Sequence, residues 1–283
     1  MAKALTTPRW IAWTATAAVV LVAALYAFHR LEQFLITDAR FALNEMGNDP
    51  GSSPAPSRDN VPELVSVSGS AHASARAIEA VFAGDAGRSV YLIPLAERRA
   101  SLRTVNWVKD AKVARFWPNR IVVGVSERKP VAFVSPASSP ASPKDSLLID
   151  EEGVILPLAR DHFTLPFLSG VSAEDELQIR QSGVKRMMDL MKDLGDAGRA
   201  VSEVDVSDPD NLKIQEPFNG HTVTLLLGDG HFALRHRHFV GYYAQLQKEA
   251  PWAATLDLRV EDSIIAKPAP GTSAKPAAKT VVK

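Results

Sequence analysis

The feature that most constrains this chain is an uncharged apolar run from Trp10 to Phe28, which stands apart in a sequence of 283 residues. As a helix rising about 1.5 Å per residue, it would cover about 28 Å, close to the hydrocarbon thickness of a bilayer. Lys3 and Arg9 precede the run without an acidic residue, whereas the basic residues after it are balanced by acidic ones. The positive-inside bias therefore predicts a transmembrane helix over 10–28, with residues 1–9 in the cytoplasm.

A cleaved signal peptide is the competing interpretation of this run. A short basic start, an apolar stretch and small residues such as Ala23 and Ala24 also describe one. The run is longer than a usual signal-peptide core of about 7 to 15 residues, and it continues through Leu25 to Phe28. We therefore expect an uncleaved anchor, which places the bulk of the chain outside the cytoplasm.

Composition removes several functional classes. The 32 basic and 32 acidic residues cancel, so no global charge favours nucleic-acid binding. The chain has no cysteine, which excludes disulfides, thiolate metal sites and a cysteine nucleophile. Residues 29–62 form a juxtamembrane segment and a Pro/Gly/Ser-rich linker, and residues 266–283 a basic tail that we expect to be disordered.

Residues 63–129 carry the pattern of a small α+β domain. A short alternating strand near Val65 is followed by a helix that Ser74 can cap, and Pro94 begins a second helix. Two alternating strands then flank a turn at Pro118, and the second of them includes Val123. The order strand, helix, helix, strand, strand predicts a layer of helices on one face of a sheet, with Ile121, Val123 and Val125 facing Ile78, Val81 and Leu102.

Three runs give this domain a specific resemblance. Trp107–Val113 reads W-V-x-x-A-x-V, Trp117–Pro118 follows, and Glu127–Ala132 reads E-x-x-P-V-A. Together they resemble the end of the POTRA domain in the FtsQ/DivIB cell-division family. Leu165–Gly170 is similar to that family's L-P-x-L-x-G segment, and Ala254–Arg259 is similar to its C-terminal D-L-R strand. The resemblance implies that residues 130–265 form an FtsQ-type β domain, a mixed sheet with flanking helices.

The sequence offers no recognisable catalytic apparatus. It has no nucleophile-elbow glycine-serine motif, no H-E-x-x-H helix and no phosphate-binding glycine loop. His236 and His238 stand two positions apart, so a regular helix would direct them away from one another. The methionines near Met187 recur at helical spacing, which is typical of a core face. We predict no enzyme activity, no cofactor, no metal, no small-molecule substrate and no nucleic-acid partner.

The resemblance implies a scaffold of the bacterial divisome in the cell inner membrane, enriched at the septum. Its partners would be FtsB-like and FtsL-like bitopic proteins and, through them, the septal cell-wall synthesis machinery. The alternative is a POTRA-bearing docking or chaperone-like module in envelope secretion or outer-membrane assembly, and a membrane-anchored hydrolase is a third. No series of alternating strands with the girdles of an outer-membrane barrel follows Glu127, which favours the scaffold.

The last predicted strand is the candidate partner site. A strand that ends a domain before a disordered tail is often at a sheet edge, where a partner can add a strand. The resemblance implies FtsB binding by such strand addition. Val260 and Ser263 depart from the aromatic and the glycine that the family often has there. An interior core strand is the other interpretation. The predicted partner-binding residues are Thr255, Leu256, Asp257, Leu258, Arg259, Val260 and Ser263.

Overall fold

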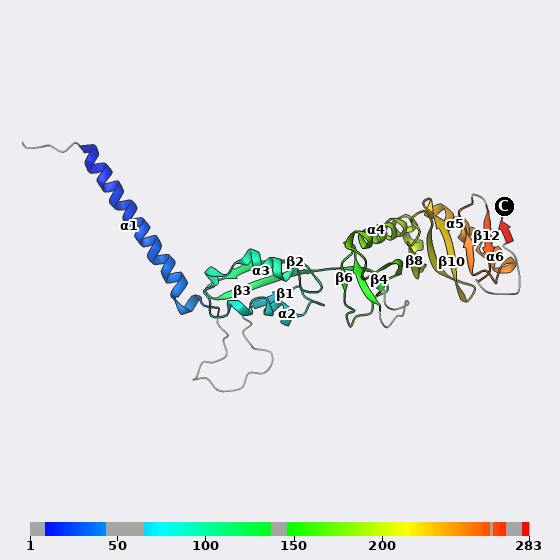
Figure 1. Ribbon diagram of the computed structural model, residues 1–283, viewed down its shortest axis with the longest axis horizontal. Helices are drawn as coiled ribbons and strands as arrows, with labels where there is room; N and C mark the ends of the chain where they lie inside the picture. The colour runs from blue at the N-terminus through cyan, green and yellow to red at the C-terminus, as the bar shows by residue number, and fades with distance from the viewer. Residues whose placement is uncertain (1–8, 44–64, 137–145, 261–262, 270–278, 283) are drawn as a thin grey trace, which may run out of the picture. The chain divides into compact units, whose positions relative to one another are not determined.

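The computed structural model of the protein describes residues 9–43, 65–136, 146–260, 263–269 and 279–282 (Figure 1). The chain divides into two compact units, Met1–Glu127 and Arg128–Lys283. The predicted cytoplasmic residues 1–8, most of the linker and part of the tail lie outside the described residues. The two units are described in turn.

The first element is one long helix, α1 (Arg9–Thr37). Within the described residues, its segment Thr16–Thr37 is the one stretch long and apolar enough to cross a membrane. The helix continues nine residues past the predicted end at Phe28, because Leu31, Phe34 and Leu35 extend the apolar pattern and no glycine or proline interrupts it. It ends where Asp38 caps the 3-10 turn η1 (Ala39–Phe41) by accepting from the Arg40 N–H.

The end of α1 is bonded to the domain that follows. The Ser89 hydroxyl donates to the Leu35 carbonyl over 2.7 Å, and the Leu43 N–H donates to the Arg88 carbonyl over 2.8 Å. Leu43 is fully buried, and the Phe41 ring packs edge-on against Trp117 with centroids 5.5 Å apart. The helix is therefore anchored by side chains and backbone together.

The first unit contains the predicted helix-covered sheet. Its strands β1 (Val65–Ser68), β2 (Val108–Phe116) and β3 (Arg120–Glu127) lie in the order β1-β3-β2, with β1 parallel and β2 antiparallel to β3. Helices α2 (Ala75–Ala80) and α3 (Leu95–Leu102) accompany them, with 3-10 turns η2 (Ala83–Asp85) and η3 (Val90–Leu92) between. Ile121, Val123 and Val125 are buried, as are Ile78 and Leu102, which confirms the predicted face; Val81 is half-buried, and Phe82 takes the buried place.

The motif residues hold this unit together. Glu127 accepts three backbone N–H groups, from Ala71, His72 and Ala73, over 2.7 to 2.8 Å. Burial alone would raise the pKa of Glu127. The hydrogen bonds from these backbone N–H groups and from the His72 side chain outweigh burial, so the pKa of Glu127 lies below its usual value. Trp107 is buried and its ring stacks on His72 at 4.5 Å. The residues that carry the resemblance are therefore packing and capping groups of the fold.

The second unit is built on one ten-stranded mixed sheet in the order β13-β12-β11-β10-β9-β8-β7-β4-β5-β6. Neighbours β4/β7, β7/β8 and β10/β11 are parallel, and the other pairs are antiparallel. The strands are β4 (Pro130–Ser135), β5 (Leu147–Asp150), β6 (Ile155–Leu156), β7 (Phe167–Ser172), β8 (Glu203–Asp205), β9 (Leu212–Phe218), β10 (His221–Gly228), β11 (Thr255–Asp257), β12 (Ile264–Lys267) and β13 (Lys279–Val282).

Three helices pack on this sheet. α4 (Leu177–Leu194) contacts β7, α5 (Phe232–Gly241) contacts β10 and α4, and α6 (Tyr243–Glu249) follows α5, while the 3-10 segment η4 (Gly195–Ala200) ends α4. The buried face of α4 includes Val184, Met187, Leu190 and Leu194, so the predicted core face is confirmed at Met187, whereas Met191 is partly buried and Met188 is 40% exposed. The spacing of Phe232, Phe239, Tyr242 and Leu246 predicts one amphipathic helix, but the structure has two there, because the chain turns at Tyr242.

The C-terminal tail departs from its prediction. Disorder was expected from residue 266 onward, yet Ile264–Lys267 form β12 and Lys279–Val282 pair with it as β13. The β-branched residues Thr280, Val281 and Val282 favour an extended strand once an edge is available for pairing. The Pro-, Ala- and Lys-rich composition of the whole tail predicted disorder, although these few residues favour a strand.

Candidate functional site

The predicted partner strand does not lie at a sheet edge. β11 covers only Thr255–Asp257 and pairs with β10 on one side and β12 on the other. Its backbone groups are therefore committed within the protein, and the expectation of an open edge at Thr255–Val260 is wrong. The chain folds back after Val260 and adds two further strands, which a prediction based on the last strong strand signal did not include.

The seven predicted residues divide into a buried and an accessible group. Leu256, Asp257 and Leu258 are at most 4% exposed, and Thr255 and Ser263 are half-buried. Val260 is 48% exposed and the Arg259 side chain 42% exposed. Alternation from Leu256 through Leu258 predicts Val260 in the core, but β11 ends at Asp257, so the pattern stops before Val260. Of the seven residues, Arg259 and Val260 are the exposed ones, each with a little under half of its surface accessible.

Asp257 organises the turn that presents these two side chains. Its carboxylate accepts from the Arg259 guanidinium over 2.7 and 2.8 Å and from the Lys267 ammonium over 3.1 Å. Hydrogen bonds from Arg259, and then from Lys267, lower the pKa of Asp257 to about 2. The carboxylate therefore stays ionised at neutral pH and joins the end of β11 to the end of β12. The D-L-R motif thus has a structural role at this corner.

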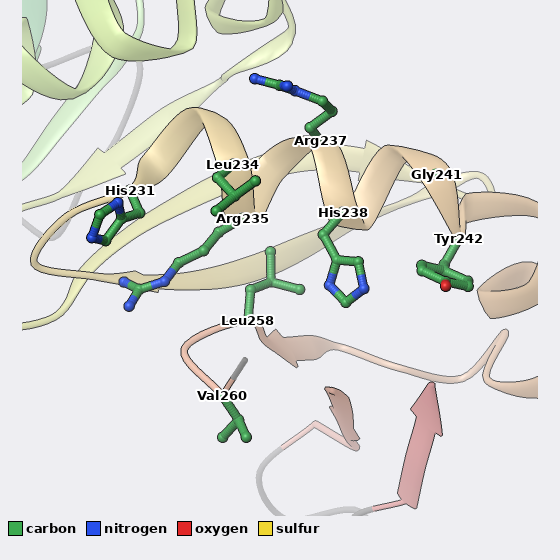
Figure 2. A pocket seen from close by; sticks show the side chains of 9 residues that line it. All are labelled: His231, Leu234, Arg235, Arg237, His238, Gly241, Tyr242, Leu258 and Val260. Atoms are coloured by element: carbon green, nitrogen blue, oxygen red, sulfur yellow. The ribbon is translucent and has the colours of Figure 1, made fainter. Parts of the chain in front are cut away.

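A groove lies between α5 and the segment 258–260, with a volume of about 480 Å³ (Figure 2). Its apolar surface includes Leu234, 61% exposed, and Tyr242, 37% exposed, together with Val260. Exposed apolar side chains gathered in a concave surface are typical of a protein-interaction site. The lining residues are His231, Leu234, Arg235, Arg237, His238, Gly241, Tyr242, Leu258 and Val260.

The polar lining of this groove is basic. Two arginines and two histidines are among its nine described lining residues, none of which is acidic, although the Arg237 side chain points away from segment 258–260 in Figure 2. The Arg235 guanidinium donates to the Leu227 carbonyl, which holds it between α5 and β10. The His238 ring packs edge-on against Tyr242 with centroids 4.9 Å apart. The arrangement suits a segment that brings apolar side chains for the floor and carboxylates for the rim.

Sequence reasoning missed the α5 side of this groove. The predicted stripe is Phe232, Phe239, Tyr242 and Leu246; Phe239 and Leu246 are buried as a core face should be, whereas Tyr242 is exposed and lines the groove. Leu234 and Val240 lie outside that stripe and are 61% and 55% exposed. Apolar residues on the polar side of an amphipathic helix were the signal that could have indicated this side of the groove.

Among the described residues, no group of three or more His, Cys, Asp or Glu side chains is placed to hold a metal ion.

Comparison with known proteins identifies the class first. The FtsQ-type POTRA domain family matches residues 62–128, which covers the helix-covered sheet of the first unit. Along the sequence, an FtsQ-type POTRA domain thus follows an apolar N-terminal helix and precedes a large mixed β-sheet. The predicted fold class, α+β with these parts, is confirmed.

Similarity to whole proteins extends past that domain. The chain is 33% identical over 227 residues to the cell division protein FtsQ of Koribacter versatilis, which is 77% of this chain and 64% of that protein. It is 25% identical over 190 residues to FtsQ of a Geobacter species, 64% of this chain and 66% of that protein. The matches span slightly less than two thirds of these relatives. The resemblance to the FtsQ/DivIB family is confirmed.

Proposed function

We propose that this chain is a non-enzymatic, single-pass membrane scaffold of the bacterial divisome. Its similarity to cell division proteins named FtsQ supports this role over the docking or chaperone-like alternative. In the proposed topology α1 crosses the inner membrane, the N-terminus is cytoplasmic and both folded units are extracytoplasmic. The chain recruits FtsB-like and FtsL-like bitopic proteins, helps control septal peptidoglycan synthesis and concentrates at the septum.

The groove between α5 and segment 258–260 is the proposed contact site for the FtsB-like partner. The observation that carries this proposal is the exposed apolar floor at Leu234, Tyr242 and Val260, in a lining that contains basic residues and no acidic one. The groove includes Val260 of the predicted partner segment, and the ion pairs of Asp257 hold the adjacent Arg259 beside it. Arg259 and Val260 then contribute side chains to the interface while β11 remains an interior strand.

Replacing the groove floor tests the proposed contact. We expect Leu234→Asp together with Val260→Asp to weaken capture of the FtsB-like protein of the same organism by at least about tenfold, because two carboxylates replace apolar contacts of an interface core. Binding is measured with the full chain in detergent. Both side chains are largely exposed, so the free energy of unfolding should change by less than about 1 kcal/mol.

Leu158→Asp is the matched control. Leu158 is also an exposed leucine of the second unit, at 46%, but it does not line the groove. It should leave capture unchanged. Equal capture by the groove variant and this control would place the partner elsewhere on the molecule.

A further inference from the structure

The strand β12 has one side built into the sheet and one side covered by the chain's own end. Its inner side pairs with β11 through Ile265, Ala266 and Lys267. Its outer side pairs with β13, where Ile265 lies opposite Thr280 and Ala266 opposite Lys279. Because β13 is the terminal strand in the sheet order, it covers the edge that β12 would otherwise present.

β12 itself is firmly held. Ile264 and Ala266 are fully buried and belong to the main hydrophobic core of the second unit. The Lys267 ammonium donates to Asp257, and the Lys267 carbonyl accepts the Ala254 N–H over 3.0 Å. The two contacts of Lys267 come from the β11 side of the strand, and the two buried side chains belong to the core. Loss of β13 would therefore leave an ordered strand with unpaired backbone groups on its outer side.

β13 is held by much less. It has four residues, its pairing with β12 changes register between Ile264 and Ile265, and it lies at the edge of the sheet, where it also contacts α6. Residues 268–278 separate it in sequence from β12. A short terminal strand of this kind can leave the edge without opening the rest of the sheet. Its β-branched sequence is also what an incoming extended peptide would need to replace it.

We infer that β13 is a tethered, displaceable strand that occupies a strand-docking edge on β12 and competes there with an extended segment of a binding partner. This inference rests on the proposed function for the identity of that partner. The tether keeps β13 at a high effective concentration near the edge. A partner strand therefore binds with an apparent affinity reduced by the fraction of chains whose edge is open. The edge takes apolar, β-branched segments, whereas the groove beside Val260 takes apolar and acidic side chains.

The first measurement uses the strand itself as the probe. A fluorescent synthetic peptide of residues 278–283 is titrated with the full chain and with a chain ending at Ala278, both in detergent. We expect the shortened chain to bind the peptide at least about tenfold more tightly, because its β12 edge is always open. Equal binding by the two chains, or no binding by the shortened one, would overturn the inference.

Point variants separate the strand pairing from the loss of residues. Thr280→Pro removes the N–H of a residue paired with Ile265 and fixes its φ near −65°, so the full chain should then behave like the shortened one. Thr280→Val keeps a β-branched residue at the same position and should behave like the unmodified chain. Opposite behaviour of these two variants would also overturn the inference.

The second measurement repeats the comparison with the FtsB-like protein in place of the peptide. Removal of residues 279–283 should lower the concentration needed for half-maximal capture by about tenfold. Capture by both chains at the same concentration would overturn the inference and leave the proposed function standing. Failure of every chain to capture the partner, with peptide binding intact, would contradict the proposed function and, with it, the competition.

Discussion

Val123→Asp is expected to unfold the POTRA domain. Val123 is fully buried in β3, the central strand, between Val67 of β1 and Val113 of β2. A carboxylate there has no cation to pair with and loses its hydration, which costs several kcal/mol. Such a cost is comparable with the total stability of about 5 kcal/mol expected for a domain of this size. Hydrogen exchange read separately for the two units should show protection lost in the first and retained in the second.

Arg120→Asp is the control on the same strand. Arg120 is exposed, and its guanidinium lies 5.1 Å from the centroid of the Phe116 ring, a contact worth about 0.5–1 kcal/mol. The domain should therefore remain folded in this variant. Comparable loss of protection in both variants would contradict the burial of this face.

Gly170→Ala is expected to destabilise the second unit by about 2–4 kcal/mol. Gly170 lies in β7 with φ +84°, a left-handed conformation that costs an alanine about 1 kcal/mol or more. A Cβ there would also overlap the backbone nitrogen of Ser207 and lie 2.6 Å from its Cα. Because the N–H of the preceding residue, Val206, donates to the Ser169 carbonyl over 3.0 Å, that backbone cannot move aside alone. Chemical unfolding of the second unit measures the loss.

Gly230→Ala provides the comparison for this variant. A Cβ at Gly230 would meet nothing within 4 Å, and its φ lies outside the left-handed region. The stability of the second unit should be nearly unchanged. If the two alanine variants had the same stability, the close approach at Ser207 could not be the reason for a glycine in the L-P-x-L-x-G segment.

The first unit could be predicted from sequence because its signals are local. Strand alternation around Val123, the Ser74 cap and the turn at Pro118 lie within a few residues of the elements that they define. The Ser74 hydroxyl does accept from the Ala77 N–H, and the strands pair as a hairpin. Local pattern and final structure agree where neighbouring residues decide the geometry.

The candidate site could be predicted only in part, because its geometry is set by distant residues. Whether Thr255–Asp257 form an edge depends on strands that follow them, and β13 pairs across a proline-rich stretch that suggested disorder. The groove joins Leu234 on α5 to Val260, which are far apart in sequence and share no periodic pattern. The D-L-R motif located the right corner of the molecule, but it did not show which side chains are accessible there.

The most direct measurement of the central claim is the position of the full chain in dividing cells. A fluorescent protein fused to the N-terminus, which the proposed topology places in the cytoplasm, and expressed at native level should form a band at the division septum, because the proposed scaffold acts where its partners assemble. A fusion carrying Leu158→Asp should form the same band. A uniform signal around the envelope, from a fusion that is intact and membrane-bound, would contradict the assignment of this chain to the divisome.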